Sequence, residues 1–257
     1  MAFLSEHKEV NEDQLESEVP SSAQPASLLT SAEYPLIGDP EQIAASEHFA
    51  VMRSRLLNAH RSGIHSVLIT SAQKGEGKTL VSTNLAISIA QLNRHRVLLV
   101  DGDLRVCGIT RLWGLQAESG LADFLQGTAL FEAVVRPSRL PFLSLVGAGN
   151  LGAGALPAVL EGPKWAEFLR VAKDKFDLII VDSVPTIAPI ADFELLSAPC
   201  DGILFIVHLH KTERQSVETT LGRMNGKLLG VVVNNAEPQV GRDYYSYYYA
   251  KKRGSMK

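Results

Sequence analysis

Short aliphatic runs alternate with helical patterns through most of the chain after residue 64. The runs are nearly continuous in apolar residues rather than alternating with polar ones, which is typical of strands buried on both faces of a parallel sheet. Predicted strands span residues 65–70, 96–100, 143–146, 177–181, 202–207 and 228–233, and predicted helices span 79–93, 120–125, 163–175, 191–198 and 212–225. This order predicts an α/β fold with a doubly wound, mostly parallel sheet that binds ligands at the carboxyl ends of its strands.

Three further segments flank this core, which we expect to be a domain over residues 64–240. Residues 1–40 begin with six acidic residues and one lysine among the first eighteen and show no apolar periodicity, so we predict a flexible acidic tail. Residues 41–63 carry apolar side chains at intervals of three or four, which predicts an amphipathic helix. Residues 241–257 contain five tyrosines among few aliphatic residues and indicate an exposed tail.

Composition and charge narrow the function classes. The 257 residues are 46% hydrophobic and 21% charged, and the formal net charge is −3, so nothing in the overall balance favours nucleic acid as a partner. Cys107 and Cys200 lack the spacing of a disulfide framework or a zinc module. Every apolar run is shorter than the roughly 20 residues of a membrane-spanning helix, and the first residues lack a signal-peptide pattern. We therefore expect a cytoplasmic protein.

The segment SAQKGEGKT, residues 71–79, lies between the first predicted strand and a helix, which is the position of a P-loop. Gly75 and Gly77 let successive backbone N–H groups point at a polyphosphate. Lys78 is expected to contact the β- and γ-phosphates of a nucleotide and Thr79 to bind Mg²⁺. Ala72 replaces the first glycine of the general pattern. The expected nucleotide-binding residues are Gln73, Lys74, Gly75, Glu76, Gly77, Lys78, Thr79 and Leu80.

Acidic residues follow two more predicted strands. Asp101 and Asp103 follow the second strand, and one of them can hold a metal while the other accepts a proton from an attacking hydroxyl. Asp182 ends another strand at the position of a Walker B acid on Mg²⁺. A helix cap or a turn is the alternative role for each. Asn234, at the end of the last strand, either hydrogen-bonds adenine or forms a turn.

These segments together resemble the motifs of a known family. SAQKGEGKT, VLLVDGDLR and FDLIIVDSVPT are similar to the Walker A, A′ and B motifs of the bacterial tyrosine kinases (BY-kinases), which are autokinases of exopolysaccharide and capsule synthesis and export. The resemblance implies that Lys78 and Thr79 bind the phosphates and Mg²⁺ of ATP. It implies that Asp103 and Asp182 organise the metal and that Asp101 activates a tyrosine hydroxyl. The implied phosphate acceptors are Tyr244, Tyr245, Tyr247, Tyr248 and Tyr249.

The resemblance also implies partners. Tail tyrosines are delivered in trans within a ring-like homo-oligomer, and Glu47 and Arg53 match the family's Glu-x-x-Arg-x-x-Arg oligomerisation pattern, with Ala50 in place of its first arginine. A membrane protein of the chain-length-determinant type is implied as the activator that recruits the chain to the inner face of the cell membrane. A tyrosine phosphatase is expected to act on the product.

Two other functions share much of this pattern. A MinD/ParA-type switch ATPase has the same fold and acidic strands, but its signature lysine would stand at Gln73, and such a protein has no use for the tyrosines. A non-catalytic nucleotide-sensing regulator of a polysaccharide export complex would bind ATP and modify no tyrosine.

Overall fold

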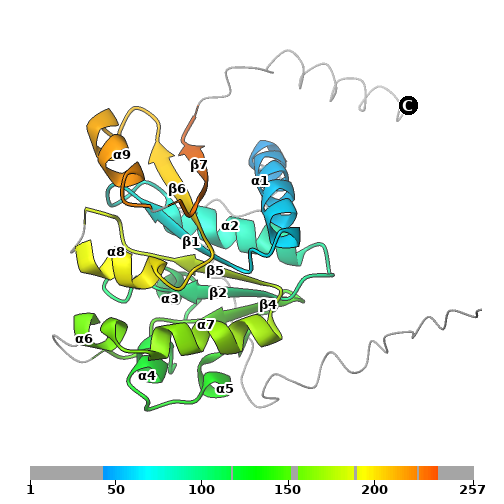
Figure 1. The fold of residues 1–257 in the computed structure, drawn as a ribbon. Helices are drawn as coiled ribbons and strands as arrows, with labels where there is room; N and C mark the ends of the chain where they lie inside the picture. Colours follow the sequence, from blue (N-terminus) through cyan, green and yellow to red (C-terminus); the bar gives the residue numbers. More distant parts are fainter. Residues whose placement is uncertain (1–42, 117, 152–155, 188–189, 225, 237–257) are drawn as a thin grey trace, which may run out of the picture.

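A computed structural model describes residues 43–116, 118–151, 156–187, 190–224 and 226–236. In these ranges the strands form one sheet in the order β3-β4-β2-β5-β1-β6-β7 (Figure 1). The strands are β1 Ser66–Ser71, β2 Val97–Asp101, β3 Arg136–Pro137, β4 Leu143–Val146, β5 Leu178–Asp182, β6 Gly202–His208 and β7 Leu228–Asn234. Neighbouring strands are parallel except β3, which runs antiparallel to β4. The predicted fold class is confirmed, and each predicted strand is present within one residue.

Helices connect the strands. They are α1 Ile43–Arg61, α2 Lys78–Ala90, α3 Gly108–Leu112, α4 Leu121–Leu125, α5 Phe131–Val134, α6 Leu156–Glu161, α7 Lys164–Lys175, α8 Ile190–Ser197 and α9 Arg214–Leu221. The helix expected over residues 41–63 is α1. We did not predict α3, α5 or α6, which span five, four and six residues. Among the described helices, none combines the length and the apolar composition that crossing a bilayer requires.

The helices cover the sheet from both sides (Figure 1). On one face α1, α2 and α3 pack on the strands through a cluster that includes Leu57, Leu85 and Ile109. On the other face a second cluster joins α4 to α8, with Phe168 and Phe193 fully buried. Every residue of β1, β2, β4 and β5 is buried, as continuous apolar strands covered on both faces must be.

The last strand is an exception to this burial. The sequence predicts that β7, like the others, is buried on both faces, and this is wrong because β7 lies at the edge of the sheet. Val231 is 47% exposed and Val233 is 51% exposed, while Val232 between them packs against the cluster that contains α1 and α2. Strand β7 nevertheless places its last residue, Asn234, beside the predicted phosphate loop.

Candidate active site

The phosphate loop joins the central strand β1 to α2 at the carboxyl edge of the sheet. Gly75 and Gly77 have positive φ angles of 78° and 95°, which few other residues adopt without strain. A Cβ atom at Gly77 would lie 2.1 Å from Nδ2 of Asn234, so a side chain there would displace the Asn234 amide. Lys78 is the first residue of α2, and the loop N–H groups and the helix N-terminus therefore share one site.

Lys78 is held inside this site. Its ammonium group donates to Oγ of Ser71 at 3.2 Å, and the residue is only 8% exposed. Burial lowers the pKa of Lys78 from its ordinary 10.5, while Asp182 and Asp103 nearby oppose the shift. A cation with few partners in a poorly hydrated loop is well suited to bind an anionic phosphate.

Two carboxylates lie side by side at the ends of neighbouring strands. Asp101 of β2 and Asp182 of β5 are register partners. The following residue, Gly102, donates from its N–H to the carbonyl oxygen of Asp182 at 2.8 Å, and a Cβ there would lie at the same distance from that oxygen. Glycine at this position therefore lets the two acidic strand ends approach each other.

Asp182 is bound directly to the start of α2. The Thr79 hydroxyl donates to its Oδ2 at 2.6 Å and the Ser82 hydroxyl to its Oδ1 at 3.2 Å. Burial raises the pKa of Asp182 to about 6, although the bonds from Thr79 and Ser82 and the charge of Lys78 oppose the shift. Ser82 was not among the predicted site residues, although it lies one turn after Lys78 on the same helix, where a helical period could indicate it.

Asp101 is the most strongly perturbed of these acids. The backbone N–H and the hydroxyl of Thr110 both donate to its Oδ2, at 2.8 and 2.7 Å, while its Oδ1 is buried with no hydrogen-bond partner among the described residues. Burial, reinforced by the charge of Asp182, raises the pKa of Asp101 to about 7 against the bonds from Thr110. A carboxylate with such a pKa is suited to accept a proton at neutral pH.

Asp103 lies in a turn just beyond β2 rather than in the strand. Its Oδ1 accepts the N–H groups of Arg105 and Val106, at 3.3 and 3.0 Å. The Arg105 side chain in turn donates from Nε to the buried Asp192 of α8 at 2.8 Å. This ion pair, which no motif predicted, connects the turn after β2 to the helix that follows the β5 loop.

Thr79 and Asp182, two of the three residues expected to hold Mg²⁺, fit that ion. Thr79 and Asp182 are hydrogen-bonded, and two carboxylates with raised pKa values, Asp101 and Asp182, mark a site where a cation would relieve excess negative charge. In the described ranges no three His, Cys, Asp or Glu side chains are grouped so that they could hold a metal. Mg²⁺ commonly takes one or two carboxylates and completes its shell with hydroxyl, phosphate and water oxygens.

The other predicted binding residues take different positions. Asn234 is the last residue of β7 and donates from Nδ2 to the carbonyl oxygen of Glu76 at 3.0 Å. Its side chain therefore supports the phosphate loop, a role different from both that the sequence suggested. Lys74 is exposed, Gln73 is half-buried, and Leu80 lies in the first turn of α2. The tyrosines expected to accept phosphate and the acidic N-terminal segment lie outside the described residues.

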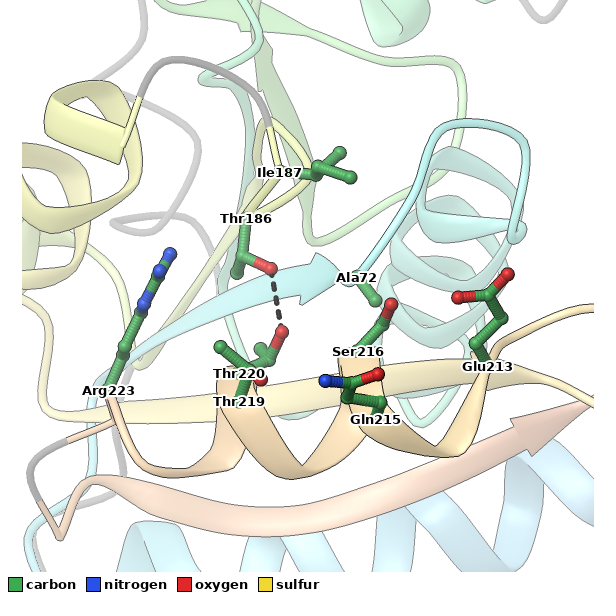
Figure 2. Close-up of a pocket in the computed structure, with 9 residues that line it drawn as sticks. All are labelled: Ala72, Thr186, Ile187, Glu213, Gln215, Ser216, Thr219, Thr220 and Arg223. Carbon is green, nitrogen blue, oxygen red and sulfur yellow. Dashed lines mark hydrogen bonds between the residues drawn. The ribbon is translucent and has the colours of Figure 1, made fainter.

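A cavity of about 250 Å³ lies beside the start of the loop, between α9 and the segment after β5 (Figure 2). Hydroxyl groups of Thr186 and Thr220 meet across it at 2.9 Å. Ala72 is part of its wall, so the methyl group that replaces the first glycine of the motif has space there. Lys78, Thr79 and the aspartates do not line this cavity, and the phosphate site is therefore separate from it.

The two residues expected to serve oligomerisation lie on α1. Glu47 is exposed. Arg53 is half-buried and donates from Nη1 to both the carbonyl oxygen and the hydroxyl of Ser88 in α2, at 2.8 and 2.9 Å. Within this chain, Arg53 therefore fastens α1 to the helix that begins at the phosphate loop.

We expect Arg53→Ala to destabilise the protein by about 1–3 kcal/mol, because it leaves the carbonyl and hydroxyl of Ser88 without their donor. Thermal unfolding would measure the loss. The exposed Arg55→Ala on the same helix is the matched control and should change the unfolding temperature little. Equal unfolding temperatures for the two variants would contradict a stabilising role for Arg53.

Comparisons with known proteins identify relatives of this site. No protein-family model matches the chain. The tyrosine-protein kinase CpsD of Streptococcus agalactiae is 29% identical over 211 residues, covering 78% of this chain and 89% of CpsD. The tyrosine-protein kinase YwqD of Bacillus subtilis is 32% identical over 186 residues, covering 71% of this chain and 77% of YwqD. The chain belongs to the bacterial tyrosine-protein kinase family. The predicted family and enzyme class are confirmed.

Other relatives and solved structures agree with this membership. The kinase spans only 22% of the succinoglycan biosynthesis transport protein ExoP of Rhizobium meliloti, at 30% identity over 66% of its own length. The kinase domain of VpsO matches with a TM-score of 0.67 and 28% identity, covering 77% of this chain and 98% of that domain. MinD of Pyrococcus horikoshii, complexed with Mg-ADP, has the same fold with a TM-score of 0.55 at 20% identity, covering 70% and 74% of the two chains.

Proposed function

We propose that this kinase transfers the γ-phosphate of ATP to tyrosines of its own C-terminal segment and thereby regulates the synthesis and export of an exopolysaccharide or capsule. The observation that carries the proposal is the convergence of Thr79, Asp101 and Asp182 at one edge of the sheet, directly beside Lys78. The relationship to ExoP supports the part of the proposal that concerns polysaccharide.

Each residue of the site has a role in this transfer. Lys78 and the loop N–H groups hold the β- and γ-phosphates, while Thr79, Asp103 and Asp182 hold Mg²⁺, which when bound neutralises phosphate charge. A phenol has an ordinary pKa near 10 and is a poor nucleophile at neutral pH. Asp101 accepts the phenolic proton, the tyrosine oxygen bonds to the γ-phosphorus, and ADP leaves.

The partners follow from the same family. The kinase acts as a homo-oligomer in which the tail of one subunit reaches the site of another, and the match of Glu47 and Arg53 to the family pattern supports this assembly. A chain-length-determinant-type membrane protein activates the kinase and recruits it to the inner face of the membrane, and a tyrosine phosphatase reverses the modification. The glutamine at position 73 favours this function over a MinD/ParA-type switch ATPase, which requires a lysine there.

Mass spectrometry of the purified chain after incubation with ATP and Mg²⁺ tests the proposal. We expect phosphate on residues 244–249, and its loss when those five tyrosines are replaced with phenylalanine, with ATP binding unchanged. The cytoplasmic segment of a candidate activator is added in a parallel sample. If ATP binds and no tyrosine is modified in either sample, the chain is a nucleotide-sensing regulator rather than a kinase of its own tail.

A further inference from the structure

Glu76, in the middle of the phosphate loop, is a completely buried carboxylate. Its Oε2 accepts the backbone N–H of Gln73 at 2.7 Å, which closes the first half of the loop onto itself. Its Oε1 accepts the hydroxyl of Thr212, more than 130 residues later in the chain. A buried carboxylate costs free energy unless donors satisfy it, so the shape of the loop depends on these two bonds.

Hydrogen bonds to His208 orient the hydroxyl group of Thr212. It lies in the connection between β6 and α9, where its backbone N–H donates to the carbonyl oxygen of His208 at 3.0 Å. Its hydroxyl oxygen accepts the N–H of His208 at 2.9 Å. The single hydroxyl proton is therefore free for Glu76, because the other hydrogen bond of this group uses a lone pair.

Two neighbouring side chains support the same loop from the same side. Lys211 donates from Nζ to the carbonyl oxygen of Gly75 at 3.3 Å. Asn234, at the end of β7, donates to the carbonyl oxygen of Glu76 at 3.0 Å. All these donors bind oxygen atoms of the loop, so none of them competes with an anion for the loop N–H groups.

We infer that Thr212 is a positioning residue for the nucleotide, acting through Glu76 to hold the phosphate loop in its binding conformation. This inference rests on the proposed ATP-binding function and adds to it a residue outside the phosphate-loop motif. Thr212 contacts no reacting atom, so it sets the affinity for the phosphates and leaves the chemical step unaffected. Preorganisation of this kind reduces the ordering that the loop must undergo on binding.

The test compares Thr212→Val, which has nearly the same shape and no hydroxyl, with Thr212→Ser, which keeps the hydroxyl. We expect Thr212→Val to weaken the binding of a fluorescent ATP analogue about tenfold, the effect of leaving one buried acceptor without its donor. Thr212→Ser should bind like the wild type, and so should Thr219→Val, an exposed threonine of α9 that undergoes the same chemical change. Saturating nucleotide should restore the wild-type phosphorylation rate to Thr212→Val.

Hydrogen exchange in the free chain supplies a second readout. We expect the loop amides of Thr212→Val to exchange faster than those of Thr212→Ser, with equal rates in the central strands. Equal ATP affinity in Thr212→Val and the wild type would overturn the inference alone, and so would a lower rate at saturating nucleotide. Failure of the wild-type chain itself to bind ATP would overturn the proposed function as well.

Discussion

Replacing Lys78 with methionine should reduce autophosphorylation by about 100- to 1,000-fold, the loss typical when one preorganised charge contact to the reacting group is removed. Methionine keeps most of the apolar stem, so the packing at the start of α2 is preserved. Lys78 is 8% exposed, and among the described residues its ammonium group donates only to the Ser71 hydroxyl, so little else holds it away from a phosphate. Phosphotyrosine detection with a time course would measure the rate.

Lys164→Met is the matched control for this substitution. Lys164 is a half-exposed lysine of α7 that pairs with Glu167 on the same helix and lies over the Phe124 ring, and it should be dispensable for phosphate transfer. A further measurement, the affinity for a fluorescent ATP analogue, should fall with Lys78→Met and not with Lys164→Met. Unchanged phosphorylation in Lys78→Met would show that this lysine does not serve the γ-phosphate.

Much of this fold is encoded locally and could be predicted from sequence. Continuous aliphatic runs such as β1 and β5 can be buried on both faces only inside a helix-covered parallel sheet, so they indicate both the strands and the layers. Strand β7 has an equally apolar sequence and is half exposed, because position in the sheet, rather than composition, decides what covers a strand. The short helices α3, α5 and α6 were not predicted, whereas α4, which is equally short, was.

Some residues of the site could be predicted from sequence and others could not. Lys78, Thr79 and Asp182 lie within motifs whose spacing implies their chemistry, and the structure brings them together. The residues that orient them come from distant segments, as Thr110 does for Asp101 and Thr212 does for Glu76. A threonine has no pattern of its own, so its role is determined only when the fold places it against a carboxylate.

Asp101→Asn should give two opposite results, a more stable protein and a kinase slowed by about 100- to 10,000-fold, the range for loss of a general base. Burial raises the pKa of Asp101 from 3.8 to about 7, a difference equivalent to about 4 kcal/mol of destabilisation when the group is ionised. The asparagine amide keeps an acceptor for Thr110 and leaves its N–H₂ group without a partner, which offsets part of the gain. We expect a net gain of about 1–3 kcal/mol at pH 8, measured by denaturant unfolding.

The stabilisation that Asp101→Asn brings should depend on pH. Because the folded pKa of Asp101 lies above its unfolded value, the folded chain binds this proton more tightly, and the group's stabilising effect is complete below about pH 4. That effect is lost as the pH rises toward about 7. The difference in unfolding free energy between Asp101→Asn and the wild type should therefore grow from pH 4 to pH 7 and then remain constant. A difference that does not change with pH would contradict the raised pKa.

Asp201 provides the control, because it lies beside the start of β1, away from the carboxyl ends of the strands. Burial opposes ionisation of Asp201, but hydrogen bonds from Lys173 and from the N–H groups of His65 and Ser66 outweigh it and lower its pKa. Asp201→Asn should therefore lose about 1–2 kcal/mol of stability and leave the transfer rate unchanged. Stabilisation with loss of transfer at Asp101, and destabilisation with retained transfer at Asp201, would separate an acid kept for chemistry from one that holds the fold. If Asp101→Asn instead destabilised the chain and retained activity, Asp101 would be a structural residue and the proton acceptor would lie elsewhere.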